Sequence, residues 1–107
     1  MIVVTTDTVA DYAITKTLGT VIGNTIRARH LGKDISAGLR SLVGGEITEY
    51  TGMMAESREQ SLQRMLDRAK ELNADAIVGV RFQTSMIMQG SAELLVYGTA
   101  VNLKQNK

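Results

Sequence analysis

The 107 residues include 12 basic and 11 acidic side chains, so the net charge of +1 creates no general field that would attract nucleic acid or an acidic membrane. The hydrophobic fraction of 44% suffices for the core of a single domain, which we expect to span residues 1–107. The absence of cysteine excludes disulfides, thiolate metal sites and a cysteine nucleophile.

The chain begins with a β-branched stretch rather than a targeting sequence. MIVVTTDTV lacks the basic and apolar regions of a signal peptide, and no apolar run reaches the ~18 residues of a membrane span, so we expect a cytoplasmic protein. Residues 2–6 predict a short strand. Residues 18–29 predict a second strand, in which Gly19 and Gly23 suggest bends or a bulge.

A helical period replaces the β pattern in the middle of the chain. Apolar residues recur at helical spacing from Asp34, a plausible N-cap, to Val43, which predicts a short helix that ends at Gly44-Gly45. The glycine pair fits neither a Walker loop nor a dinucleotide fingerprint, and Glu46 directly after it would repel phosphate. A corner between two helices is therefore favoured, with a ligand-facing turn as the alternative.

Residues 46–72 contain no proline and predict one long helix. Its apolar stripe consists of Ile47, Tyr50, Met54, Ser61, Met65, Ala69 and Leu72. At 1.5 Å per residue the helix would be ~40 Å long, whereas a compact domain of this size is only ~34 Å across. The stripe would then overhang its own core and require a partner, which predicts an oligomer.

Two strands at 76–88 and 92–103 complete the chain, joined by a short loop with the sequence QGS. Alternation predicts one shared face for Ala76, Val78, Val80 and Phe82, and another for Leu95, Tyr97, Thr99 and Val101. The order β–β–α–α–β–β predicts an α+β fold, with a small antiparallel or mixed sheet packed by one short and one long helix.

Arg58 falls among apolar positions of the long helix, where an unpaired charge would be costly. An ion pair with Asp34, Asp75 or a neighbouring chain is the structural interpretation. The functional interpretation is an anion site in a pocket between subunits, because a guanidinium binds carboxylate or phosphate through two bonds.

Arg81 interrupts the strand at 76–88, on the face that alternation predicts to lie opposite Val78, Val80 and Phe82. It either marks the solvated side of that strand or faces Glu46 across a contact between strand and helix or between subunits.

Candidate metal ligands and catalytic groups are few. The only histidine, His30, is a weak metal candidate, and Met86 and Met88, which we expect on one strand face, more often fill cores. A ring of copies could still collect one His or Met from each chain. The sequence has no Ser-His-Asp set, no His-Glu-x-x-His pattern and too few aromatic residues for a single-stranded nucleic acid platform.

Three segments together resemble the YbjQ-like family, often described as a heavy-metal-binding domain: GKDISAGLRSLVGGEITEYTGMMAESREQSLQRM, NADAIVGVRFQTS and VYGTAV. The resemblance covers nearly the whole chain. It implies a dodecin-like α+β subunit assembled as a closed homopentamer. The positions that match the family pattern are Asp34, Arg40, Gly44, Gly45, Tyr50, Arg58, Ala74 and Gly79.

The resemblance also bears on Glu46 and Arg81. Some family members carry Arg at the first position and Asp at the second, and a reciprocal exchange of that kind suits a salt bridge. The hypothesis predicts that Glu46→Arg disrupts assembly and that adding Arg81→Asp restores it.

These observations favour a non-enzymatic, ring-forming homo-oligomer that binds a small anion or a metal ion at its subunit interfaces. The ligand-binding or interface candidates are Asp34, Arg40, Glu46, Tyr50, Arg58 and Arg81, with His30 for a metal. The alternatives are an enzyme with an interface active site built from Asp34, Tyr50 and Arg58, or a scaffold that binds another protein through an exposed apolar patch.

Overall fold

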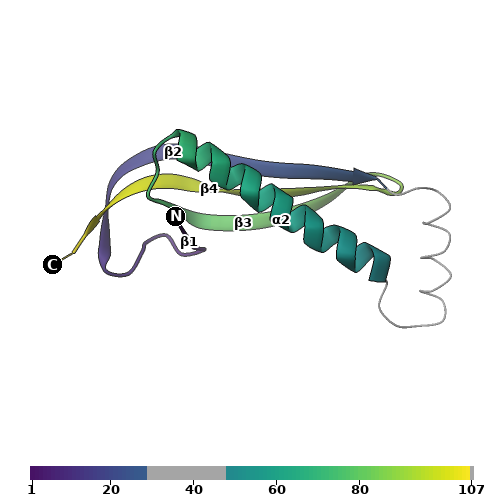
Figure 1. The fold of residues 1–107 in the computed structure, drawn as a ribbon, viewed down its shortest axis with the longest axis horizontal. Coiled ribbons are helices and arrows are strands. Elements are labelled where there is room, and N and C mark those ends of the chain that lie inside the picture. Colours follow the sequence, from purple (N-terminus) through teal and green to yellow (C-terminus); the bar gives the residue numbers. More distant parts are fainter. Residues whose placement is uncertain (29–47, 107) are drawn as a thin grey trace.

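The computed structural model describes residues 1–28 and 48–106. Their elements are β1 (Ile2–Val3), β2 (Tyr12–Ala28), α2 (Thr48–Glu71), β3 (Ala76–Met88) and β4 (Ser91–Gln105). The strands form one mixed sheet in the order β1-β3-β4-β2 (Figure 1), in which only the β1–β3 pair is parallel. The α+β class is thereby confirmed, whereas the predicted short helix and the Gly44-Gly45 corner lie outside the described residues.

The strands are longer than predicted at three of their ends. Strand β2 begins six residues before the predicted start, because two register irregularities, near Thr15 and Leu18, let the pairing with β4 continue past Gly19. Strand β3 has the predicted bounds, and Gln89-Gly90 makes the tight turn into β4, with Gly90 at a φ of 76°.

Helix α2 forms over a stretch that is rich in good helix formers, with Gly52 as its one weak residue after Thr51. Residues 52–71 contain no proline, valine, isoleucine or threonine. The helix ends in a left-handed cap at Asn73 (φ 60°), where the Ala74 N–H donates to the Ala69 carbonyl and the Asn73 N–H to that of Lys70. No helix in the described part of the chain is long and apolar enough to cross a membrane.

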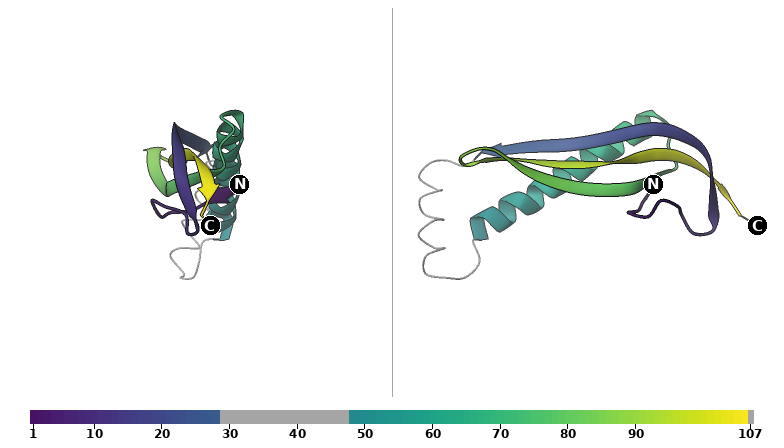
Figure 2. Two further views of the ribbon diagram at one scale, coloured as in Figure 1. Left: turned by 90° about the vertical axis from the view of Figure 1, so that its left-hand side faces the viewer. Right: turned by 180° about the vertical axis from the view of Figure 1, so that it is seen from behind.

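Helix α2 lies against one side of the sheet, over β2 and β4 (Figures 1 and 2); we call this the helix side and the other the open side. The helix contributes small and medium side chains at four-residue spacing: Ser57, Ser61, Met65 and Ala69, all buried. The strands contribute Val21, Ile77, Val80, Val96 and Ala100 to the same core. At this helix–sheet contact Gly23 meets the helix backbone directly.

A bulge in β3 shows that the shared face predicted for Ala76, Val78, Val80 and Phe82 is wrong. Val78 pairs with Thr99 and Arg81 with Tyr97, so two residues of β3 oppose the single residue Gly98. The extra residue is accommodated at Gly79, whose φ of 62° favours glycine. Val78 therefore faces the open side, whereas Val80 and Phe82 face the helix side.

A second, smaller core lies on the open side beneath the N-terminal segment. Ala76, Val78 and Val101 are buried there against Ile2, Val4, Val9 and Leu103. The backbone of residues 2–6 runs beside β3, with hydrogen bonds from Val4 N–H to the Ile77 carbonyl and from Gly79 N–H to the Thr6 carbonyl. The N-terminal segment thus covers one end of the open side only.

The molecule is elongated, with extents of 58 × 24 × 16 Å and a radius of gyration of 17.7 Å, where a compact chain of this length would give ~13 Å. The 24 residues of α2 span ~36 Å, whereas the 17 residues of β2 span ~56 Å. The sheet is therefore longer than the helix, and part of it is left uncovered. Helix α2 crosses the sheet obliquely and its first turns lie beyond the strands (Figure 1), where none of the described side chains before Ser57 is buried, so the expected overhang is present at the N-terminal end of the helix.

Candidate functional site

Over most of its length the open side of the sheet has no described element lying on it (Figure 2, right), and apolar side chains are exposed there. The pairing register places Ile22 beside Tyr97 and Ile26 beside Glu93 on this side, and all but Glu93 are at least a third exposed, with Ile26 at 61%. Glu93 accepts a hydrogen bond from Asn24 Nδ2 at 3.1 Å, which orders its carboxylate on the same surface. An uncovered sheet face usually presents polar residues to water, so the exposure of three large apolar side chains beside the polar ones is unusual.

The second half of β3 is a free sheet edge. Every residue from Arg81 to Met88 is exposed, including Phe82 (48%), Met86 (80%) and Met88 (64%). On one side this stretch pairs with β4; on the other, no described residue pairs with it. We call residues 82–88 the edge strip.

The edge strip lacks the features by which proteins protect such edges from pairing. Its sequence, FQTSMIM, has no charged residue and no proline. Natural edge strands usually carry a lysine, a proline or an inward charge, since bare strand edges recruit further strands. The described part of the chain thus leaves the strip open to pairing with a further strand.

The strip does not form a two-methionine metal site. Met86 pairs with Ala92 and Met88 with Ser91, so a second bulge at Ile87 turns the two methionines to opposite faces. The expectation that they share a face is wrong for this reason. Among the described residues no three His, Cys, Asp or Glu side chains lie together in a way that could hold a metal ion.

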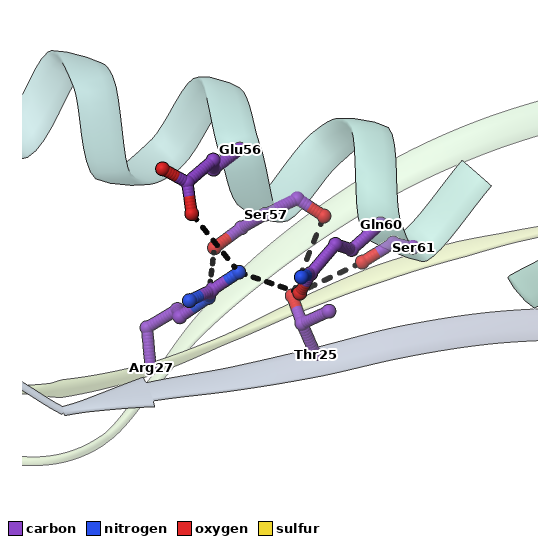
Figure 3. A network of polar contacts seen from close by, with 6 residues as sticks. All are labelled: Thr25, Arg27, Glu56, Ser57, Gln60 and Ser61. Carbon is purple, nitrogen blue, oxygen red and sulfur yellow. Dashed lines mark hydrogen bonds and ion pairs between the residues drawn. The ribbon is translucent and has the colours of Figure 1, made fainter. Parts of the chain in front are cut away.

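A polar network joins α2 to β2 near the strand's C-terminal end (Figure 3). The hydroxyls of Thr25 and Ser61 lie 3.1 Å apart, and Ser61 donates to the Leu94 carbonyl at 3.2 Å. Arg27 covers this pair: its Nε donates to Ser57 Oγ at 3.1 Å and its Nη2 to Gln60 Oε1 at 2.5 Å. All three hydroxyl side chains are buried and bonded, so the network fixes the position of the helix on the strand.

Replacing Arg27 by methionine should lower the free energy of unfolding by about 1–3 kcal/mol, because it removes two hydrogen bonds and leaves the buried Ser57 hydroxyl without its donor. Glu56, 3.6 Å from Arg27 and 72% exposed, forms only a screened ion pair, so Glu56→Gln should cost less than ~1 kcal/mol. Urea unfolding at fixed protein concentration measures both. Equal losses in the two variants would show that the ion pair, and not the hydrogen bonds, dominates.

A cleft of about 250 Å³ opens at the free edge of β2, beside the last turns of α2. Thr20, Ile22, Arg68, Glu71 and Leu72 line it, so a cation and an anion stand at its rim above apolar walls. Such a cleft can accept a small polar molecule or a side chain from another chain.

Two of the six candidate residues chosen from the sequence, Arg58 and Arg81, have described side chains, and they do not form a common site. Arg58 is exposed, one position from the buried Ser57, so its predicted place within the apolar stripe is wrong. Arg81 donates to the carbonyls of Thr5 (2.9 Å) and Val80 (2.8 Å), which ties the N-terminal segment to β3. The side chains of Asp34, Arg40, Glu46 and Tyr50, and that of His30, lie outside the described residues.

Asp75, a proposed partner of Arg58, has a different role in the structure. Its carboxylate accepts from the Leu103 N–H at 2.8 Å and from Asn102 Nδ2 at 3.3 Å, and it makes no ion pair with Arg58. Sequence reasoning also missed Arg27 and its network. The signal was present, since Ser57 and Ser61 are four residues apart and continue into Met65 and Ala69.

Comparison with known proteins gives one consistent family. Residues 1–104 match the YbjQ family model, whose description is "Putative heavy-metal-binding". A UPF0145 protein of Methanosarcina acetivorans is 59% identical over 96% of this chain and 97% of its own, and one of Archaeoglobus fulgidus is 56% identical over 97% and 96%. A UPF0145 protein of Methanoculleus marisnigri is 54% identical over the full length of both chains.

One solved structure supports the fold alone. It is a DUF74-family protein of unknown function from Pediococcus pentosaceus, with a TM-score of 0.70 and 18% identity over 97% of this chain and 98% of that one. Its agreement over nearly the whole length shows that the elongated α+β arrangement is shared at low sequence identity.

Proposed function

The chain belongs to the YbjQ family, and from that premise we propose that it is a cytoplasmic, non-enzymatic subunit of a closed homo-oligomer, five copies by family resemblance, which holds a small anion or metal ion where copies meet. The observation that carries the proposal is the uncovered sheet. Ile22, Ile26 and Tyr97 on the open side and Phe82 and Met86 on the edge strip together expose apolar surface that an isolated chain leaves in water.

The near-neutral charge of the chain supports association between identical copies. A net charge of +1 gives negligible repulsion between subunits, so burial of apolar surface decides the outcome. The cleft at the β2 edge supports a ligand position, because it lies beside the same exposed strand and a neighbouring copy would close it.

The family description raises the question of a heavy metal, and the described residues do not fit one within a single chain. Soft metals take thiolate, imidazole or paired thioether ligands, yet the chain has no cysteine and its two strip methionines face opposite ways. Any metal would need donors contributed by several copies.

Native mass spectrometry of untagged protein tests the assembly. We expect a single species at five times the 11.6 kDa subunit mass, and a reproducible mass excess if a ligand is retained. Elemental analysis of the same sample separates a metal from an organic or inorganic anion. A monomer at micromolar concentration would refute the proposal and favour a scaffold that uses the apolar surface to bind another protein.

A further inference from the structure

The geometry points to a head-to-tail contact, in which the edge strip of one copy adds as a strand to the free edge of β2 in the next copy and so continues the sheet from subunit to subunit. This inference rests on the proposed homo-oligomer and specifies which surfaces meet. The occupant of the strip is a second copy of this chain.

The chain offers two unpaired edges of different sequence, one at each side of the sheet. In the strand order β1-β3-β4-β2, the edge strip belongs to β3 and the opposite edge is β2, which pairs with β4 alone among the described strands. Like the strip, β2 is poorly protected: between Ala13 and Ile26 its only charged residue is Lys16. Within the described chain, each edge therefore has backbone N–H and C=O groups without a strand partner, and the edge of another copy can provide that partner.

The two edges are also aligned. Phe82 pairs with Val96, which pairs with Gly23, and Met86 pairs with Ala92, which pairs with Arg27. The strip thus lies level with residues 23–27 of β2 across the sheet. Both strands run antiparallel to β4 and hence parallel to each other. If neighbouring copies are related by rotation about an axis parallel to the strands, the strip of one copy meets β2 of the next with no shift along the strand direction. A rotation without translation produces a closed ring and not a filament.

The side chains fit the same arrangement. Phe82 and Met86 project to the helix side, where α2 of the neighbour lies over the neighbour's β2. Added to that edge, these two side chains would meet the flank of the neighbour's helix and leave water. On the open side, Gln83 and Ser85 of the strip would lie beside Ile22 and Ile26 of the neighbouring copy's β2 and cover part of their apolar surface.

A subunit-mixing experiment tests the head-to-tail contact. Met86→Lys damages the strip and Ile26→Lys damages the β2 surface, and both positions are mostly exposed, so each variant should keep the circular dichroism spectrum of the unmodified subunit. Each variant alone should be monomeric by native mass spectrometry. An equimolar mixture should give a 1:1 heterodimer, since one intact strip meets one intact β2 edge. Gln63→Lys, exposed on α2, is the matched control and should assemble normally.

The mixing experiment distinguishes failure of the head-to-tail contact from failure of the proposed homo-oligomer. If the unmodified protein is a monomer, both fail. If it assembles but Met86→Lys also assembles, or if the mixture stays monomeric, the head-to-tail contact is wrong and the oligomer stands. A contact between two identical strips gives a different result. Ile26→Lys keeps its strip intact and would form a homodimer by itself, whereas Met86→Lys would stay monomeric both alone and in the mixture.

Cross-linking provides a second measurement that does not depend on disrupting the assembly. The natural chain has no cysteine, so Ser85→Cys can be combined in turn with Ile22→Cys, Asn24→Cys or Ile26→Cys, all on the open side. A double variant in register should give an oxidised ladder up to the closed ring, and each single variant should give none. A cross-linked dimer from Ser85→Cys alone would instead show symmetric strip-to-strip pairing and overturn the inference.

Discussion

Gly23→Ala is expected to destabilise the protein by about 3 kcal/mol or more, at the upper end of the range for overpacking. A Cβ on Gly23 would lie 1.9 Å from the Ser61 carbonyl oxygen and 2.6 Å from the Met65 backbone nitrogen. Both atoms belong to the helix backbone, which cannot rotate away as a side chain can. The whole of α2 must lift from β2, and the core around Met65 opens. Urea unfolding monitored by far-UV circular dichroism measures the loss.

Gly52→Ala is the matched control for this substitution. Apart from its chain neighbours and the backbone of its own helix, no atom lies within 4 Å of the Cβ that it would add, and its position is inside α2. Alanine in a helix interior is favoured over glycine by about 0.5–1 kcal/mol, so this variant should be slightly more stable than the parent. If Gly23→Ala were tolerated as well as Gly52→Ala, the close contact between α2 and β2 would be wrong.

Met65→Ala should cost about 2–5 kcal/mol, the second large effect expected. Met65 is fully buried and is the largest side chain that α2 places in the core, between Val21, Val80 and Val96. Truncation removes its contacts and leaves a cavity between the two layers that a single helix cannot close. The midpoint of urea unfolding should fall with little change in its slope.

Met65→Leu separates lost volume from lost chemistry. Leucine nearly conserves the volume and the hydrophobicity, so the cost should stay below ~1.5 kcal/mol. A large loss in both variants would instead mean that the shape of the unbranched chain is required, and a small loss in both would mean that the helix–sheet core contributes little to stability.

The helix–sheet layer was predictable from local pattern, whereas the orientation of individual residues on it was not. Ser61, Met65 and Ala69 follow directly from a 3.6-residue period. Arg58 was misplaced because a stripe drawn through widely spaced apolar residues is broad, and one position corresponds to ~100° of rotation. Its neighbour Ser57, a small polar residue, takes the buried position because the Thr25 and Arg27 side chains satisfy its hydrogen bonds.

The two bulges in β3 show why alternation fails in a long strand. Alternation fixes the face of each residue only while the register is unbroken, and one extra residue moves every later side chain to the other face. Gly79 offered a signal for the first bulge, since an isolated glycine inside a strand often marks one. Ile87 offered none, because an isoleucine is an ordinary strand residue. The elongation of the molecule was likewise invisible, since an estimate based on compact domains presupposes the shape in question.

The central position of β4 has a consequence for the synthesis of the chain. Strand β4 lies between β3 and β2, and its Gln105 pairs with Tyr12 at the start of β2. Strand β2 is therefore synthesised long before the strand with which it pairs, and the closure of this long loop slows folding. Until β4 has emerged from the ribosome, β2 and α2 are present without the strand that joins β2 to the rest of the sheet. The two free edges of the sheet acquire their aligned positions only when β4 has been inserted between β3 and β2.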